Sequence, residues 1–301
     1  MKEPGESGAS AESWAGAGSW AGAEDRASGE RGAGGESGPH GGPAGGPARR
    51  GLIVVSSVAR LPGGRRAGFW LPEAAYPWRA LTSAGWDFAF AGTREGTPRI
   101  GGVDRSDLPQ RLFLDDGTVR ERLAATTTAD RYTPADFGIV LIAGGHGAML
   151  DLPEDPRLAG FLTRFHAGGG VVVAVCHGVA ALLPARSPGG APLVAGRRVT
   201  GFSRAEEEAA GLAATVPFFL DEALRERGAR YEAGEPFAPH VVRDGNLVTG
   251  QNPASAAEAT ALGMRLALGR ELPLNWLIGH TGKYAGSPRS GTAGNTHEMT
   301  A

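Results

Sequence analysis

Cysteine is nearly absent from this chain of 301 residues, in which Cys176 is the only one. A single cysteine excludes an internal disulfide and is typical of proteins from a reducing compartment. We therefore expect a cytoplasmic protein whose one thiol is either a small buried side chain or a reactive group.

Large aliphatic side chains are missing from the first 50 residues, in which two tryptophans are the only large apolar groups after Met1. Glycine, alanine, serine, glutamate, proline and arginine dominate this segment. It cannot bury enough apolar surface to offset the entropy of ordering it, so we expect residues 1–50 to be disordered. A similar composition predicts a flexible tail at 281–301 and leaves 51–280 as one domain.

Long hydrophobic runs and an excess of charge of one sign are also missing. No apolar stretch reaches membrane-spanning length, and none near the start resembles a secretory signal. The net charge is −2, which gives no basic face for nucleic acid or anionic lipid. Neither HExxH nor CxxC spacing occurs. We therefore expect no membrane or nucleic-acid partner, no metal and no cofactor.

The chain does contain short apolar runs that alternate with segments of helical periodicity. Such alternation predicts a three-layer α/β/α sandwich with a mostly parallel central sheet. Strands are expected at 52–57, 87–91, 137–142, 171–175 and 197–201, and a hairpin at 240–249. Helices are expected at 71–84, 158–165, after 178, from 206, at 218–227 and at 255–268, with a loop-rich insertion at 92–114 and a polar, partly helical piece at 115–128.

Cys176 ends the apolar run 171–175 and directly precedes His177 and Gly178. This position is a strand-to-helix turn, which is how α/β enzymes present a nucleophile. Backbone N–H groups and a helix dipole at such a turn favour a thiolate, so we expect a lowered thiol pKa. The adjacent histidine and glycine make a catalytic thiol the better interpretation.

A second strand end carries the turn Gly144-Gly145-His146-Gly147. Consecutive glycines let the backbone approach a ligand and point N–H groups at it. We predict that the N–H groups of Gly145 and His177 form an oxyanion hole beside the thiol. The alternative is an ordinary tight turn that the His146 side chain braces.

Carboxyl groups occur at two further places. Glu73 lies near the start of the helix at 71–84, beside Trp70, where a raised pKa would suit proton exchange with the thiol. The alternative is a glutamate that only favours the helix dipole. One of the three glutamates at 206–208 could orient His177. The alternative there is a solvated acidic face.

The order of these segments resembles the PfpI/DJ superfamily, and more narrowly its glyoxalase III and chaperone-like branch of the heat-shock-protein-31 type. The resemblance spans residues 51–268. It rests on GFWLPEAAYPW (68–78), AGGHGAMLDLP (143–153), VVAVCHGVAALL (172–183), RRVTGFSRAEEEAAGL (197–212) and HVVRDGNLVTGQNPASA (240–256).

The resemblance implies a flavodoxin-like fold, that of class I glutamine amidotransferases. It implies Cys176 as nucleophile, His177 as its base, Glu73 as the acid at the thiol and Glu207 as the residue that orients the histidine. It also assigns the oxyanion site to Gly144-Gly145. Two positions depart from the pattern, because Val179 stands where many relatives have proline and Tyr76 where histidine is common; both concern substrate preference.

The leading hypothesis is a cofactor-independent lyase of the glyoxalase III type, which converts methylglyoxal and water to lactate. A deglycase or amidase would use the same acyl-thioester chemistry. A holdase chaperone or a redox sensor in stress response is the alternative from another class. Glutamine amidotransfer is disfavoured because its histidine lies far downstream of the cysteine. The resemblance implies a small reactive aldehyde as substrate and a homodimer.

Overall fold

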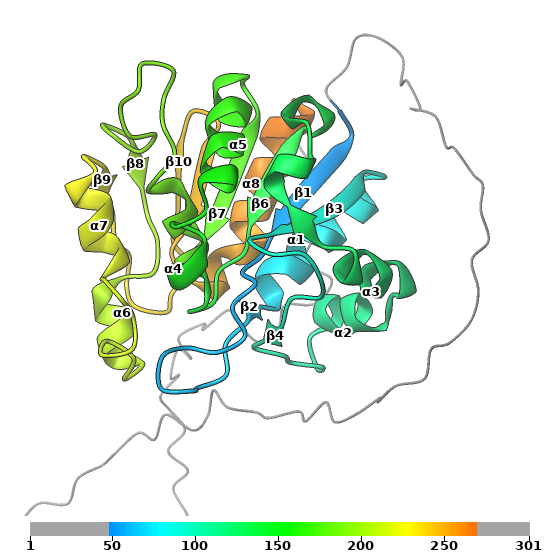
Figure 1. Cartoon of the computed structure of the whole chain (residues 1–301), viewed down its shortest axis with the longest axis horizontal. Coiled ribbons are helices and arrows are strands. Elements are labelled where there is room, and N and C mark those ends of the chain that lie inside the picture. Colours follow the sequence, from blue (N-terminus) through cyan, green and yellow to red (C-terminus); the bar gives the residue numbers. More distant parts are fainter. Residues whose placement is uncertain (1–47, 270–301) are drawn as a thin grey trace, which may run out of the picture.

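The structure is a computed structural model that describes residues 48–269 (Figure 1). The expected N-terminal tail, apart from its last three residues, and the expected tail at 281–301 lie outside the described residues. Within 48–269, strands and helices alternate around one central sheet, as the sequence predicts.

The central sheet has seven strands in the described residues, in the order β10-β11-β7-β6-β1-β3-β5. All neighbours are parallel except β10 and β11, which form the expected hairpin. The strands are β1 (Arg50–Val54), β3 (Asp87–Gly92), β5 (Thr127–Thr128), β6 (Ile139–Ile142), β7 (Val171–Val175), β10 (Val241–Asp244) and β11 (Leu247–Gly250).

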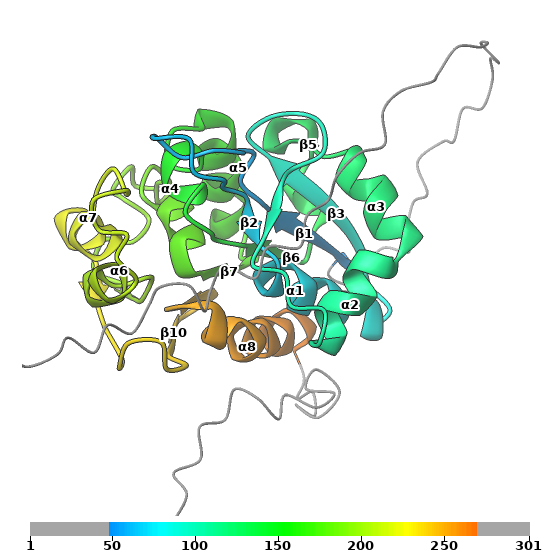
Figure 2. The same cartoon turned by 90° about the horizontal axis from the view of Figure 1, so that it is seen from below.

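Helices cover both faces of this sheet, as Figure 2 shows with α1 and α8 on one side and α4 and α5 on the other. The predicted three-layer α/β/α sandwich is therefore correct. The helices are α1 (Pro72–Ser83), α2 (Leu108–Asp115), α3 (Gly117–Ala124), α4 (Ala148–Asp151), α5 (Pro156–Ala167), α6 (Arg204–Ala209), α7 (Leu220–Glu226) and α8 (Ala256–Leu268).

Alternate residues of the buried strands fill two cores. In β1, Ile53 packs in the core beneath α1 and α8, whereas Leu52 and Val54 pack in the core beneath α5. The same alternation divides Val173 from Val172 in β7. Strands buried on both faces need apolar residues at every position, which explains the continuous apolar runs of the sequence.

Local signals set several boundaries where they are expected. The Asp155 carboxylate accepts the N–H groups of Arg157 and Leu158 at the start of α5, with Pro156 in its first turn. Gly85 follows α1 at φ +70°. None of the helices in 48–269 is long and apolar enough to cross a membrane.

The helix expected after Gly178 is the 3₁₀ helix η4 (Cys176–Leu182). Two other expectations differ from the structure. The strand expected at 197–201 is β8 (Arg198–Val199), which pairs with β9 (Arg230–Tyr231) outside the central sheet. The insertion expected to be loop-rich contains α2 and β4 (Ile100–Gly101), which pairs with β2 (Phe69–Trp70).

Short 3₁₀ segments complete the described chain. They are η2 (Ala129–Arg131), η3 (Pro134–Asp136) and η5 (Pro253–Ser255). The carboxyl ends of β6 and β7 lie side by side, because Ile142 pairs with Ala174. The turns that follow these two strands therefore meet at one edge of the sheet.

Candidate active site

Cys176 is held in a strained turn directly after β7. Its φ is 57°, in the left-handed region that residues with side chains rarely adopt, and its side chain is buried. Strain of this kind persists only where the surroundings enforce it, and it presents nucleophiles at strand-to-helix turns of α/β enzymes. The geometry therefore matches the predicted position of the thiol.

Two backbone donors point at this thiol. The N–H groups of Gly145 and His177 both donate hydrogen bonds to the sulfur of Cys176. Gly145 has φ +99°, and a Cβ there would lie 2.5 Å from the carbonyl oxygen of Gly68, so only glycine fits. These are the two donors predicted for the oxyanion hole.

Glu73 reaches the same turn from the first turn of α1. Its Oε2 accepts the N–H of Gly144 at 2.6 Å. A Cβ on Gly144 would lie 2.7 Å from the backbone nitrogen of His177 and 2.9 Å from this oxygen. Close packing of three chain segments around Gly144 thus brings the carboxyl group next to Cys176.

Burial controls the protonation of Glu73. Burial raises its pKa from 4.5 to about 8, against the smaller opposite effects of the Gly144 hydrogen bond and of the Cys176 thiol. The raised pKa predicted for this residue is confirmed. Because Gly144 occupies Oε2, and Oε1 is buried without a hydrogen-bond partner, the proton resides at Oε1 near neutral pH.

His177 lies between the thiol and a carboxylate. Its Nδ1 is 3.3 Å from the sulfur of Cys176, and its Nε2 is 2.6 Å from Oε1 of Glu207. We assign the proton to Nε2, because a carboxylate can only accept. Nδ1 is then free to take the thiol proton.

Of the three successive glutamates, the structure brings Glu207 to the histidine. Glu206 points away and accepts hydrogen bonds from Ser203, Phe237 and Asn252, whereas exposed Glu208 pairs with Arg204 at 2.7 Å. Their identical chemistry left the choice open in the sequence. The spacing of Ser203 and Glu206 is that of a capping box, which is formed here and could have separated Glu206 from its neighbours.

His146 joins the same carboxylate from the β6 turn. Its Nε2 is 3.2 Å from Oε2 of Glu207, and its ring centroid is 4.3 Å from that of His177. The side chain thus braces Glu207 and the imidazole, while the backbone of its turn supplies the donor of Gly145.

Both His177 and Glu207 have a lowered pKa. Burial, assisted by His146, lowers the pKa of His177 to about 4 despite its bond to Glu207. Burial on its own would raise the pKa of Glu207, but the hydrogen bonds from both histidines outweigh it and bring the pKa to about 2. At neutral pH the histidine is therefore neutral and the glutamate ionised.

The thiol does not show the lowered pKa that we expected. Burial raises the pKa of Cys176 well above its usual value, and the Glu73 charge adds to this. The N–H groups of His177 and Gly145 do act in the expected direction, but they are weaker than burial. The correction implies that the thiol is protonated at rest and is deprotonated by a base during reaction.

Sequence spacing also missed one cluster. His146, His177 and Glu207 offer three ligand atoms within 4.8 Å of one another and could hold a metal ion. They come from three separate segments, so no ligand motif appears in the chain. Their mutual hydrogen bonds already account for this arrangement.

The two positions that depart from the resembling family are both buried. Val179 lies in η4, and the hydroxyl of Tyr76 donates to Asp107 at the start of α2, at 3.2 Å. Two aromatic residues that we did not anticipate also lie near the site. The Phe202 ring packs at a tilt against His177 with ring centroids 4.4 Å apart, and the Phe237 ring lies 6.4 Å from that of Phe202.

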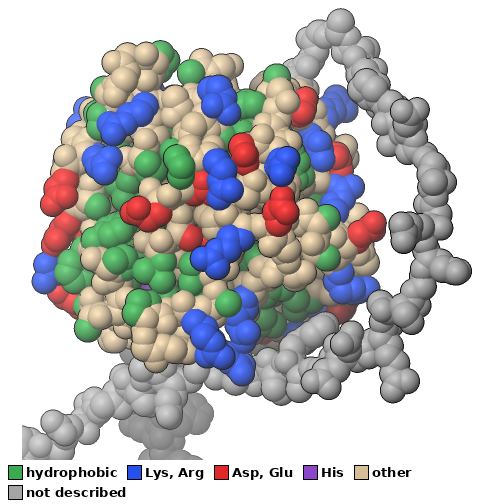
Figure 3. Space-filling view, viewed as in Figure 1, with side chains coloured by type: hydrophobic (Ala, Val, Ile, Leu, Met, Phe, Trp, Pro, Cys, Tyr) green, Lys and Arg blue, Asp and Glu red, His purple; other side chains and the backbone are tan. Residues whose placement is uncertain are grey.

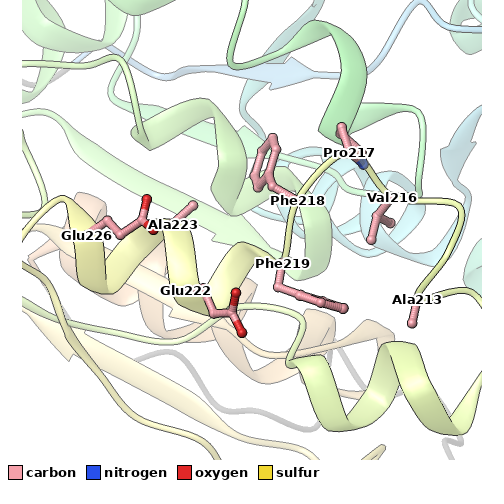
Figure 4. A pocket seen from close by; sticks show the side chains of 8 residues that line it. All are labelled: Ala213, Val216, Pro217, Phe218, Phe219, Glu222, Ala223 and Glu226. Carbon is pink, nitrogen blue, oxygen red and sulfur yellow. The ribbon is translucent and has the colours of Figure 1, made fainter.

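A separate surface pocket of about 310 Å³ lies between the segment 213–219 and α7 (Figure 4). Phe218, Phe219 and Pro217 line it together with two glutamates of α7. Figure 3 shows hydrophobic side chains exposed over this part of the molecule. No candidate catalytic residue lines this pocket, so the chemistry belongs to the strand ends.

Known proteins resemble the chain over most of its described part. Glyoxalase 3 of Candida albicans is 30% identical over 209 residues, which are 65% of this chain and 87% of that protein. The crystal structure of glyoxalase III from Candida albicans superimposes with a TM-score of 0.67 and 26% identity, over 74% of this chain and 98% of the other. A probable glutathione-independent glyoxalase of Schizosaccharomyces pombe, hsp3103, is 37% identical over 46% of this chain, but the match spans only 56% of that protein. Residues 67–262 match the DJ-1/PfpI family, and the chain belongs to this family.

Proposed function

We propose that this protein is a glutathione-independent glyoxalase that converts methylglyoxal and water to lactate. The names of the similar proteins of Candida albicans and Schizosaccharomyces pombe support this substrate class. The observation that carries the proposal is the placement of Glu73, a carboxyl group with a pKa of about 8, against a thiol that receives two backbone N–H donors. Such a group can both give and take a proton near neutral pH.

In the first step the sulfur of Cys176 adds to the aldehyde carbon. The thiol proton passes to Nδ1 of His177, which lies 3.3 Å away, while the new oxyanion lies between the N–H donors of Gly145 and His177. Glu73 then protonates this oxygen from Oε1, which gives a neutral hemithioacetal and leaves Glu73 as a carboxylate. Ionised Glu207 stabilises the imidazolium that forms.

In the second step the Glu73 carboxylate removes the hydrogen from the former aldehyde carbon, while the His177 imidazolium gives its proton to the ketone oxygen, so that an enediol forms and His177 is neutral again. Glu73 then returns its proton to the neighbouring carbon and takes up the hydroxyl proton of the carbon bound to sulfur. The hydrogen has moved by one carbon, and a lactoyl thioester of Cys176 remains. Water, activated by neutral His177, hydrolyses the thioester and restores the thiol. The overall change adds one water to methylglyoxal and needs no external electron donor or acceptor.

Two alternatives use the same residues. A deglycase or amidase would form and hydrolyse the same thioester without moving a hydrogen between carbons. A redox sensor would need an accessible thiol of low pKa, whereas the Cys176 side chain is buried and its pKa is raised. The geometry therefore favours turnover over oxidation as the role of the thiol.

The protein is expected to be a cytoplasmic homodimer that acts on a small aldehyde. A single cysteine fits a reducing cytoplasm. The expected small aldehyde substrate agrees with a site that is buried at the strand ends. We keep a homodimer as the expected assembly, which the molar mass in solution would test.

The proposal is tested with purified wild type, Cys176→Ala and Glu73→Gln, incubated with methylglyoxal without glutathione. We expect wild type to form lactate, with deuterium from D₂O at the second carbon where the Glu73 proton exchanges with solvent. Both variants should lose at least about 10³-fold in kcat, since each removes a group that bonds to or exchanges protons with substrate.

Exposed Glu208 offers a matched control, since Glu208→Gln removes a carboxylate next to Glu207 without touching the site. It should turn over like wild type. Wild-type turnover by Cys176→Ala or Glu73→Gln would overturn the mechanism. A wild-type protein that forms no lactate but prevents aggregation of a client protein would establish the chaperone hypothesis instead.

A further inference from the structure

Phe237 has an unusual backbone for an exposed aromatic residue. Among the described residues, only Cys176 and Phe237 combine a side chain with a positive φ, which is 61° at Phe237. Its side chain is 39% exposed, so it does not fill a core. Glycine would adopt this conformation without strain, so the phenylalanine side chain at this position costs backbone strain.

The conformation of Phe237 is enforced by a buried carboxylate. Oε1 of Glu206 accepts the N–H of Phe237 at 2.8 Å and also the side-chain amide of Asn252 at 2.8 Å. Asn252 in turn donates to the carbonyl oxygen of Ala238 at 2.7 Å. These hydrogen bonds connect the loop around Phe237 to α6 and to the start of α8. They oppose a movement of the loop that would relax the strain.

The other oxygen of Glu206 anchors the segment that carries Phe202 and Glu207. Oε2 accepts the N–H and the hydroxyl of Ser203, at 3.0 and 2.9 Å, as part of the capping box of α6. One carboxylate thus fixes the position of the Phe237 loop relative to the residues that touch His177.

A series of ring contacts connects Phe237 to the imidazole of His177. The Phe237 ring centroid is 6.4 Å from that of Phe202, which is 4.4 Å from His177. His146 lies 4.3 Å from His177 and 6.2 Å from Phe202. The imidazole is held by ring contacts from Phe202 and His146 while Glu207 holds its Nε2.

We propose that Phe237 is a positioning residue for catalysis, which backs the Phe202 ring so that Phe202 holds the imidazole of His177 at the thiol. This inference rests on the proposed role of His177 as the base. Glu206 holds Phe237 in place by fixing its backbone. The strained backbone turns the partly exposed Phe237 ring toward Phe202.

The test compares three substitutions at one position in the full chain. Phe237→Ala and Phe237→Gly both remove the ring, but only glycine relieves the strain. Both should lower kcat for methylglyoxal by about three- to tenfold with little change in KM, the range expected when one aromatic contact is lost. Phe237→Gly should nevertheless be more stable to urea than Phe237→Ala. Phe237→Tyr keeps the ring and should retain wild-type kcat.

A second measurement does not depend on the proposed reaction. The rate at which iodoacetamide alkylates Cys176 at neutral pH, followed by intact mass, reports how well His177 assists the thiol. It should fall by about three- to tenfold in both ring-less variants and not in Phe237→Tyr. Leu108→Ala removes another exposed hydrophobic side chain, on α2, and should change neither rate.

The outcomes separate the two proposals. If wild type forms no lactate but alkylation slows in Phe237→Ala and Phe237→Gly, the lyase function is wrong and the positioning role stands. If kcat and the alkylation rate are both higher in Phe237→Gly than in the less stable Phe237→Ala, the residue is only structural and the inference is overturned. Wild-type rates in both variants would overturn it as well.

Discussion

The turns after β6 and β7 lie side by side at the carboxyl edge of the sheet, but they accommodate a positive φ differently. The β6 turn places it on Gly145, which has no side chain to clash. The β7 turn places it on Cys176, where the side chain is the reactive group. A turn that supplies backbone donors can use glycine, whereas a turn that presents a nucleophile must bear the strain.

Glu73 couples these two turns. It accepts the N–H of Gly144 in the first, and its charge acts on Cys176 in the second. The comparison therefore predicts three different responses. A change in the β6 turn should affect the backbone N–H donors, and a change at Glu73 should affect how stability depends on pH. A change in the β7 turn should affect the backbone strain.

Apart from the removal of a reacting side chain, the largest effect is expected at the β6 turn, from Gly145→Ala. The new Cβ would lie 2.5 Å from the Gly68 carbonyl oxygen, so the turn must shift and its N–H must leave the sulfur. We expect kcat to fall by about 10²-fold, the usual consequence of losing one oxyanion donor. Steady-state kinetics measure the loss.

The control for this change is Gly169→Ala, at the opposite end of β7. Gly169 also has a positive φ, of +84°, but a Cβ there meets nothing within 4 Å. This variant should lose stability from strain alone and keep its kcat. Equal kcat in both variants would show that the β6 turn contributes no donor.

A smaller effect is expected from Glu73→Gln on stability. The pKa of Glu73 rises from 4.5 to about 8 on folding, so the folded state holds this proton more tightly. Wild type must then lose stability, relative to the variant, as the pH rises from 4.5 toward 8. We expect the difference in the free energy of unfolding to change by about 2 kcal/mol between pH 5 and 7.

Urea unfolding of both proteins at several pH values measures this difference. Glu208→Gln, at an exposed carboxylate, should show no comparable trend. A constant difference between wild type and Glu73→Gln across this range would contradict the raised pKa and with it the role of Glu73 as a proton donor.

The smallest effect is a difference in stability between two variants of the β7 turn. Cys176→Gly should be more stable than Cys176→Ala by about 1 kcal/mol, because glycine adopts the left-handed conformation without strain. Within β7, Ala174→Gly should instead lose at least about 0.5–1 kcal/mol, since it adds freedom to the unfolded chain and removes a buried methyl group. If Cys176→Gly is the less stable of the two variants, the turn is not strained.

Much of the fold could be predicted because its signals are local. Asp155 and Pro156 begin α5, Gly85 follows the end of α1, and the hairpin expected around Asp244-Gly245 turns at Gly245 and Asn246. A helix was expected after Gly178, but its 3₁₀ type was not, because the apolar run fits either kind of helix and tertiary packing decides. The separate pairing of β8 with β9 depends on a partner about 30 residues away, which no local pattern reveals.

The candidate site was predicted as a set of residues and corrected in its electrostatics. The residues alone left three glutamates open and the resemblance pointed to Glu207, which lies 2.6 Å from His177 in the structure. Nothing in the sequence pointed to Phe237, because the type of a residue does not reveal that its φ is positive. Both required distances between segments that are far apart in the chain.

The sequence alone determined which strands alternate with helices and that Cys176 ends a buried strand beside His177, because periodicity and adjacency are properties of the chain. Only the tertiary structure decided the charges. The donors expected to lower the thiol pKa are present, but burial beside Glu73 outweighs them and raises it. Desolvation depends on every neighbour that excludes water, and those neighbours are brought together only by folding.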